Sequence, residues 1–184
     1  MHTFVSLLRG INVGGHHLIG MPALKAFYES LGFVDVTTYI QSGNIIFRAT
    51  AGDTSSVELL IEKSLVHTFG FPVTVIVRSP SHLGKVIKNN PYVARGGVDS
   101  SRLAVSFLKS QPAPALIKAM AVFAAKSTNE YTAVSGVVYL HCPDGFGKTL
   151  LTTGFFEKHL KVKATARNWK TTNALFALCA KMDK

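Results

Sequence analysis

The chain has 184 residues, 47% of them hydrophobic, and carries 20 basic against 10 acidic residues, a formal net charge of +10. This composition excludes a disordered chain, and no apolar run approaches the roughly 20 residues needed to cross a bilayer. The start of the chain lacks the basic segment of a signal peptide, and Arg9 interrupts its apolar stretch at residues 4–8. Two cysteines, Cys142 and Cys179, are too few for a disulfide scaffold or a Cys-rich zinc site. We therefore expect a reduced, cytoplasmic protein without membrane contact.

The positive charge is concentrated in the later part of the chain. Residues 1–72 hold four basic and five acidic residues, a net charge of −1, whereas residues 73–184 hold 16 basic and five acidic ones, a net charge of +11. The densest part is residues 148–184, with eight basic and two acidic side chains. This asymmetry favours an anionic partner, either nucleic acid or a phosphorylated molecule. A solvated surface that only keeps a small protein soluble is the alternative.

The first part of the chain alternates strand and helix patterns. Three glycines within residues 10–15 mark a loop after the first apolar run, and Gly32 ends the first helical pattern. The predicted elements are strand 3–8, helix 21–31, strand 36–40, strand 45–47, helix 57–69 and strand 73–77. This βαββαβ order is typical of a ferredoxin-like unit.

The order then repeats. Ser79 can cap a short helix that has Pro80 at its first position, and residues 90–101 are the best linker candidate. The predicted elements that follow are strand 103–108, helix 116–123, strand 131–134, strand 137–140, helix 151–160, strand 162–166 and helix 172–179. Local echoes, such as residues 5–8 against residues 105–108, indicate an internal duplication. We predict an α+β protein of two tandem ferredoxin-like (βαββαβ) halves with antiparallel sheets, residues 1–90 with the connecting helix and residues 91–184 with the terminal helix.

Such a topology brings one loop and one hairpin together. The loop after the first strand and the hairpin between the middle strands emerge at the same end, so Arg9 and Asn12 should lie near Gln41, Ser42 and Asn44. Arg9 and the glycine backbone can hold an anion, and the amides suit a neutral polar ligand or a base edge. Alternatively, the same residues lock the loop to the hairpin, because Gly and Asn tolerate positive φ.

A second candidate lies at the opposite end of the second sheet, where residues 141–148 should approach Arg167, Asn168 and Trp169. Asn168 is a natural helix N-cap. Trp169, the only tryptophan, can stack on a base or sugar together with Arg167. The alternative is a helix cap beside a packed aromatic ring.

Several segments resemble a known family. L-L-R-G-I-N-V-G-G at residues 7–15, Y-I-Q-S-G-N at 39–44, P-D-G-F-G-K-T at 143–149 and A-R-N-W-K-T at 166–171 are similar to the hallmark segments of the mostly bacterial domain-of-unknown-function family 1697. The resemblance covers nearly the whole chain. It implies a two-part, ferredoxin-like α+β fold and carries no activity over. Ala166 stands where the family more often has Thr, so no hydroxyl role carries over to that position.

Other motifs mainly exclude functions. Gly147-Lys148-Thr149 follows a predicted strand and is predicted to open a helix, but a Walker A motif needs Gly where Cys142 stands, so only a weaker anion site is possible there. The seven histidines show no metal-binding spacing, and Ser42 and Ser135 lack the G-x-S-x-G context of a serine nucleophile. We expect neither a metal nor a cofactor.

These patterns favour a binding module for an anionic ligand, phosphorylated or nucleic acid. An RNA-binding sheet is disfavoured, because residues 45–48 offer one aromatic side chain and no stacking platform. A small-molecule enzyme with its site at the Arg9, Gln41 and Asn44 end, and a structural or regulatory interaction protein, remain as alternatives. The candidate ligand-binding residues are Arg9, Asn12, Gln41, Ser42, Asn44, Arg167, Asn168 and Trp169.

Overall fold

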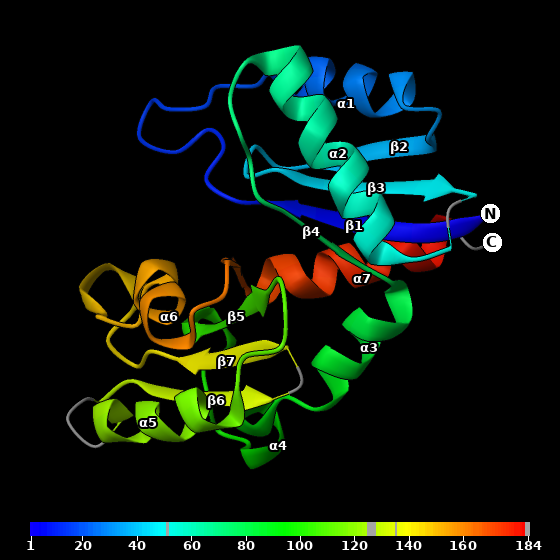
Figure 1. Cartoon of the computed structure of the whole chain (residues 1–184). Helices are drawn as coiled ribbons and strands as arrows, with labels where there is room; N and C mark the ends of the chain where they lie inside the picture. The colour runs from blue at the N-terminus through cyan, green and yellow to red at the C-terminus, as the bar shows by residue number, and fades with distance from the viewer. Residues whose placement is uncertain (51, 125–127, 135, 183–184) are drawn as a thin grey trace. The chain divides into compact units, whose positions relative to one another are not determined.

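The structure is a computed structural model that describes residues 1–50, 52–124, 128–134 and 136–182 (Figure 1). The chain divides into two compact units: unit 1 comprises Met1–Gly84 and Ala174–Lys184, and unit 2 comprises Lys85–Asn173. The division therefore falls inside helix α3 (Pro80–Lys88) and again inside the last helix, α7 (Trp169–Met182). The ranges 1–90 and 91–184, which follow the sequence repeat, remain a prediction.

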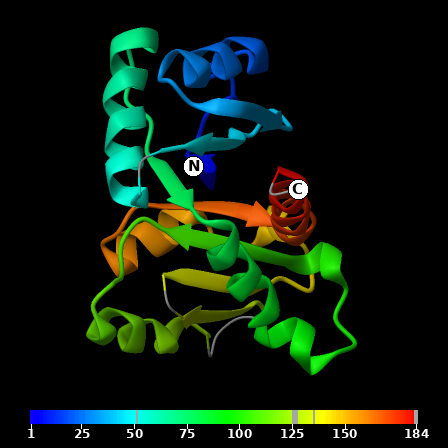
Figure 2. The same ribbon diagram turned by 90° about the vertical axis from the view of Figure 1, so that its right-hand side faces the viewer.

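Unit 1 contains the first βαββαβ arrangement. Its elements are β1 (His2–Leu8), α1 (Met21–Ser30), β2 (Val34–Tyr39), β3 (Asn44–Ala49), α2 (Thr54–Phe69) and β4 (Val75–Arg78). The strand order is β2-β3-β1-β4, and every neighbouring pair is antiparallel. Helices α1 and α2 lie on the same face of this sheet (Figure 2), where Leu24 and Ile61 join Phe4, Leu8 and Phe47 in one core. The apolar runs of β1, β3 and β4 and the helical spacing of the apolar residues in α1 and α2 together produce this layer.

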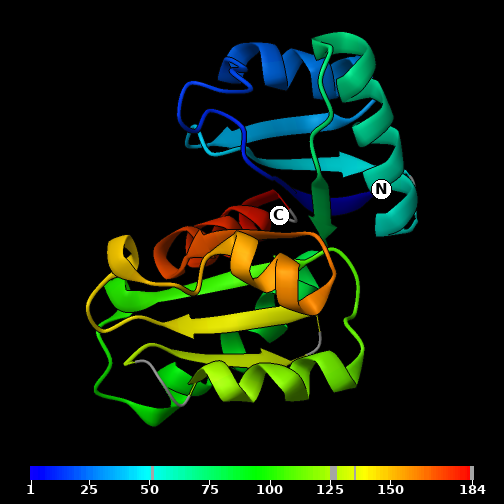
Figure 3. The same ribbon diagram turned by 60° about the vertical axis from the view of Figure 1, so that its left-hand side comes forward.

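Unit 2 contains the second arrangement. Its elements are β5 (Leu103–Leu108), α5 (Pro114–Ala124), β6 (Glu130–Val134), β7 (Val137–His141), α6 (Thr153–Leu160) and β8 (Ala164–Asn168). The order β6-β7-β5-β8 reproduces that of unit 1, again with antiparallel neighbours. Helices α5 and α6 lie along one face (Figure 3), where Met120, Phe156 and Leu160 pack on Leu108 and Val138. The predicted α+β fold of two ferredoxin-like halves is confirmed.

Equivalent backbone hydrogen bonds occur in both halves, which shows that the repeat extends to the register of the strands. In each half, the end of the first strand is bonded to the middle hairpin and to the start of the fourth strand. The matched pairs are Leu8 N to Gly43 O at 2.8 Å and Leu108 N to Gly136 O at 2.9 Å, then Arg9 N to Thr74 O at 2.9 Å and Lys109 N to Lys163 O at 2.8 Å. The predicted turn residue Ser135, beside Gly136, lies outside the described residues.

The outer edge of each fourth strand is closed by carboxylates from the preceding helix. Glu58 and Glu62 of α2 accept hydrogen bonds from the amides of Val77 and Val75, both at 2.8 Å. In unit 2, Glu157 of α6 accepts one from the amide of Ala164 at 3.0 Å. Exposed edge amides are a template for pairing with another strand, so these carboxylates protect the β4 and β8 edges.

The sheet faces opposite these helices are also buried. Val5 and Leu7 in unit 1, and Val105 and Phe107 in unit 2, are all 0% exposed. Tyr139 on the same face of unit 2 donates its hydroxyl to the carbonyl of Val86 in α3 at 3.0 Å. Ferredoxin-like RNA-binding domains stack bases on an open sheet face, whereas these described side chains of β1, β5 and β7 are buried.

Two connecting segments differ from their predictions. The predicted linker at residues 90–101 contains helix α4 (Pro91–Arg95), because the Asn90 side chain accepts a hydrogen bond from Tyr92 N at 3.0 Å and proline occupies the first helical position. It is followed by the 3-10 turn η1 (Ser100–Arg102).

The prediction that Gly147, Lys148 and Thr149 open a helix was wrong. Residues 146–148 form only a 3-10 turn, η2 (Phe146–Lys148), and α6 starts at Thr153. Its N-cap is Thr152, whose hydroxyl accepts a hydrogen bond from Phe155 N at 3.2 Å. The helix start that would attract an anion is therefore not at the glycine, because a hydroxyl cap further along the chain sets it.

Candidate functional site

Asn12 joins the loop that follows β1 to the hairpin between β2 and β3. Its side-chain amide donates to the carbonyls of Ile19 and Gln41, both at 2.9 Å, and its carbonyl oxygen accepts from Ile19 N at 2.8 Å. Its φ of 55° lies in the left-handed region that Asn tolerates better than most residues. The neighbourhood expected from the antiparallel topology is therefore present.

The hairpin itself is held by a buried amide. Asn44 is 0% exposed, and its side chain donates to the Tyr39 carbonyl and to the Ser42 hydroxyl, both at 3.0 Å. Gly43 has a φ of +72°, and a β-carbon there would lie 2.8 Å from side-chain atoms of Leu8 and Ile11. Only glycine fits this close approach, so the Q-S-G-N motif is first of all a tightly packed turn.

That the residues of this first group bind a ligand remains a prediction. The side-chain amides of Asn12 and Asn44 are engaged by backbone and hydroxyl groups of the same turn system. Gln41 is exposed and contributes its backbone carbonyl to Asn12, while the Arg9 side chain is half-buried. The arrangement favours the locking role that the sequence left open.

The second group lies at the junction of β8 and α7. Arg167 is 7% exposed and donates from Nη1 to the Thr165 hydroxyl and the Ala166 carbonyl, both at 2.8 Å. Burial lowers the pKa of this guanidinium to about 10, so it stays charged at neutral pH. Asn168 accepts a hydrogen bond from Thr171 N at 2.7 Å, the N-cap geometry expected from the sequence.

Trp169 is 8% exposed, so the ring of this residue does not present an open surface to a base or sugar. Its backbone carbonyl accepts a hydrogen bond from the Asn173 side chain at 2.8 Å. The R-N-W motif therefore consists of a buried cation, a helix cap and a packed ring. Ligand binding by these three residues also remains a prediction.

A different group emerges from unit 2. We call Lys109, Lys158, Lys161 and Lys163 the lysine end. These residues lie where β5 ends and β8 is about to begin, as the backbone bond from Lys109 N to Lys163 O shows. Lys161 is the C-cap of α6 with a φ of 58°, and its amide is bonded to the Glu157 carbonyl at 3.0 Å. This turn is therefore well defined.

The three later lysines of this end are exposed, and none of them forms an ion pair with any described residue. The nearest carboxylate along the chain, Glu157, is bonded to the amide of Ala164 in the β8 edge. The sequence showed that positive charge is dense in this region, but it did not show which lysines lack an ion pair. Ion pairing depends on which residues the fold brings together.

Unit 2 carries most of the net charge, with 13 basic and four acidic residues, a net charge of +9. Apart from Glu157, its carboxylates gather at the opposite end of the sheet, where β5 begins and β7 ends. Asp99 accepts hydrogen bonds from Ser101, and Asp144 accepts one from Thr128 at 3.0 Å. The charge of unit 2 is thus polarised along its strands, with the lysine end as its basic pole.

Glu130, at that opposite end, is held by an arginine and a histidine. Arg95 of α4 donates both terminal nitrogens to its carboxylate, at 2.9 and 3.0 Å, and His141 Nδ1 lies 2.8 Å from Oε1. The hydrogen bonds from Arg95 and then from His141 lower the pKa of Glu130 to about 2. Arg95 also lies over the Tyr92 ring at 5.4 Å. This network fastens α4 to the β6–β7 hairpin, and nothing in the local sequence pointed to it.

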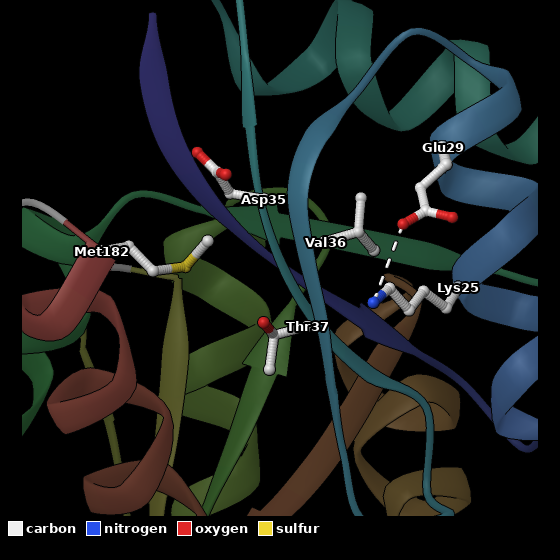
Figure 4. Close-up of a pocket in the computed structure, with 6 residues that line it drawn as sticks. All are labelled: Lys25, Glu29, Asp35, Val36, Thr37 and Met182. Atoms are coloured by element: carbon white, nitrogen blue, oxygen red, sulfur yellow. Dashed lines mark ion pairs between the residues drawn. The ribbon is translucent and has the colours of Figure 1, made fainter.

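A polar cavity of about 530 Å³ opens beside α1 and β2 of unit 1 (Figure 4). Its charged side chains are largely neutralised within the unit: Lys25 Nζ lies 3.8 Å from Glu29 Oε1, and Asp35 Oδ2 lies 3.1 Å from Arg48 Nη1. With two carboxylates and one ammonium group in its lining, this cavity does not suit an anion. The lining residues are Lys25, Glu29, Asp35, Val36, Thr37 and Met182.

A second cavity of unit 1, of about 660 Å³, lies among residues 1–4, 52–54 and 79–81, beside the starts of α2 and α3. Both helix starts already have side-chain caps. Asp53 accepts from Ser56 N at 2.8 Å, and Ser79 accepts from His82 N at 3.2 Å. Each cap engages one of the amides that an anion would otherwise use at that helix start.

The described residues contain neither a metal-binding group nor a membrane-spanning helix. No three His, Cys, Asp or Glu side chains among them gather into a metal-binding group. None of the helices in the described ranges combines the length and apolar character that crossing a membrane requires.

Comparison with known proteins finds a solved structure with the same architecture. A solved structure of a conserved bacterial protein from Streptococcus pneumoniae, SP0830, superposes with a TM-score of 0.73 at 21% sequence identity, covering 97% of this chain and 98% of that one. At this identity the likeness concerns the fold. A search of curated proteins finds no significant match. The family of proteins of unknown function DUF1697 matches residues 1–139, which include two of the hallmark segments, L-L-R-G-I-N-V-G-G and Y-I-Q-S-G-N. The chain belongs to the DUF1697 family.

Proposed function

We propose that this protein binds a phosphate-rich anionic ligand, nucleic acid in the first place, and that the lysine end of unit 2 is its binding surface. The observation that carries the proposal is that Lys158, Lys161 and Lys163 are exposed and form no ion pair within the described chain. They belong to a unit with a net charge of +9. Such a cluster attracts a polyanion by releasing condensed counterions.

The geometry favours contact with phosphates over base reading at this surface. Lysine presents a compact charge on a flexible stem, whereas planar bidentate recognition is the property of arginine. The described sheet residues Val105 and Phe107 are 0% exposed and therefore offer no platform on which bases could stack. Binding at the lysine end is therefore expected to depend on salt and little on nucleotide sequence.

The backbone around the lysine end supports a fixed arrangement of charges. Lys161 caps α6, and Lys163 is bonded through its carbonyl to Lys109. Because Glu157 is bonded to Ala164 N, its carboxylate is directed to the strand edge. The exposed side chains of Lys158, Lys161 and Lys163 are then available to follow a phosphate backbone.

The test is binding of a fluorescently labelled single-stranded oligonucleotide, measured by anisotropy from about 50 to about 200 mM salt. The variant replaces Lys158, Lys161 and Lys163 by Glu. A matched control replaces Lys63, Lys88 and Lys181 by Glu, since these lysines are also exposed and lie outside the lysine end.

We expect the wild-type protein to bind with a steep salt dependence. Removing three phosphate contacts should reduce the slope of log K against log salt by about 2, and the control should change both affinity and slope much less. No binding by the wild-type protein at low salt, or an equal loss in both triple variants, would overturn the proposal. Circular dichroism of the variants confirms that they are folded.

A further inference from the structure

The connection between β7 and α6 exposes two large apolar side chains. Phe146 in η2 is 38% exposed and Leu150 is 82% exposed. Phe146 stands between Gly145 and Gly147, and it makes no ring contact with any aromatic side chain in the described ranges. Phe146 is not among the described residues that form or pack against the core between α5, α6 and the sheet of unit 2.

A guanidinium group lies beside this turn. Gly145 has a φ of +89°, and a β-carbon at this position would lie 2.6 Å from Arg102 Nη1. Glycine therefore allows the Arg102 side chain to lie against the residue that precedes Phe146. The Arg102 side chain is 43% exposed. Its Nε lies 3.8 Å from Asp99 Oδ2, a distance longer than a hydrogen bond.

Asp99 does not form a hydrogen bond with this guanidinium. Its carboxylate instead accepts hydrogen bonds from the amide and the hydroxyl of Ser101, at 2.8 and 2.7 Å. Arg102 makes no side-chain hydrogen bond with a described residue. A phenyl ring and a guanidinium with open donors beside the same turn are groups that can receive an unpaired base and its phosphate.

We propose that Phe146 stacks on an unpaired base and that Arg102 binds the neighbouring phosphate, so that the ligand of unit 2 is single-stranded nucleic acid. This inference rests on the proposed function and assigns a second contact to it. The acidic residues Asp99 and Asp144 keep the local net charge low, so this contact adds base dependence while the lysine end supplies long-range attraction.

The separation of the two contacts makes the ligand's length matter. The six-residue strand β5 runs from the Phe146 end to the lysine end, a distance of roughly 20 Å at about 3.3 Å per residue. A dinucleotide can occupy one contact only, whereas a longer single strand can reach both. A duplex keeps its bases stacked internally and cannot use Phe146.

The experiment compares Phe146→Ala, Phe146→Trp and Leu150→Ala against three probes: a single-stranded oligonucleotide, a duplex of the same length, and heparin. Leu150→Ala is the matched control, because it removes an exposed side chain of the same connection that cannot stack. We expect Phe146→Ala to weaken single-strand binding about tenfold without changing heparin or duplex binding. Phe146→Trp should retain binding, and its fluorescence should be quenched by the oligonucleotide.

The outcomes separate this inference from the proposed function. If Phe146→Ala leaves single-strand binding unchanged while the lysine triple variant weakens it, the stacking contact is refuted and the proposed function stands. Equal losses in Phe146→Ala and Leu150→Ala, or an equal loss toward heparin, would also refute stacking. If the lysine triple variant weakens no probe, the proposed function fails, and quenching of Phe146→Trp then reports separately whether a base reaches this position.

Discussion

Arg78 and Arg167 occupy the same position in the two halves of this protein. Each donates from Nη1 to the carbonyl of the residue before it, Val77 at 2.7 Å and Ala166 at 2.8 Å, and they lie opposite Val5 and Val105 in the two sheets. Burial lowers the pKa of both guanidinium groups.

The residues that follow them are equivalent as well. Ser79 caps α3 by accepting from His82 N at 3.2 Å, as Asn168 caps α7 by accepting from Thr171 N. The R-N-W motif of the second half therefore corresponds to Arg78, Ser79 and Pro80 of the first. Its pattern is that of a strand-to-helix junction, in which an arginine near the end of the strand is followed by a polar residue that caps the helix.

This equivalence predicts how Asn168 tolerates substitution. Asn168→Ala should reduce the free energy of unfolding by about 1 kcal/mol, because the Thr171 amide loses its cap. Asn168→Ser, which installs the residue used at the equivalent position of the first half, should retain most of that stability. Urea unfolding followed by circular dichroism measures both. Equal stability losses for Ala and Ser would show that the cap is not what Asn168 contributes.

The loop-to-hairpin lock gives a second prediction. Asn12→Gly keeps the positive φ accessible but removes three hydrogen bonds to backbone groups, so it should lower the free energy of unfolding by about 1–3 kcal/mol. Gln41→Ala is the matched control, since Gln41 contributes its backbone carbonyl to the lock and its side chain is exposed. Its effect should stay within about 0.5 kcal/mol. If Asn12→Gly unfolds at the wild-type urea concentration, the lock does not stabilise the fold.

The Glu130 network predicts a pH dependence with a defined sign. Hydrogen bonds from Arg95 and His141 lower the pKa of Glu130 from 4.5 to about 2 in the folded protein. A carboxyl group with a lowered folded-state pKa stabilises the fold fully above its unfolded pKa, and this contribution disappears as pH falls through the folded one. The window is therefore about pH 5 to pH 2. The effect is small, because the Glu130 side chain is 41% exposed and solvent screens the ion pair.

Comparing the wild-type protein with Glu130→Gln isolates this contribution. The difference in melting temperature should be constant above about pH 5 and should shrink toward zero as the pH approaches 2, because protonation then removes the same charge from the wild-type protein. Thermal unfolding in a series of buffers provides the measurement. A difference that stays unchanged across this window would mean that the carboxylate charge of Glu130 does not stabilise unit 2.

Local chemistry in the sequence was sufficient for the order and type of the elements in the two βαββαβ arrangements. Apolar periodicity distinguishes helix from strand, and Gly and Pro mark where each element ends. Both βαββαβ arrangements were predicted on that basis, and the antiparallel topology then required the loop after β1 to meet the β2–β3 hairpin. The Asn168 cap was also readable, because an N-cap needs only residues within one helical turn.

Only the tertiary structure decided which of these residues are engaged and which remain available. Arg167 and Trp169 appear in the sequence as candidates for contact with a ligand, yet the fold leaves them 7% and 8% exposed. Conversely, the fold joins Arg95 to Glu130 and His141, which are 35 and 46 positions away, and it brings Arg102 against Gly145. Burial and pairing arise from contacts between distant parts of the chain, so a local pattern can show which groups are present but not which ones the fold has already used.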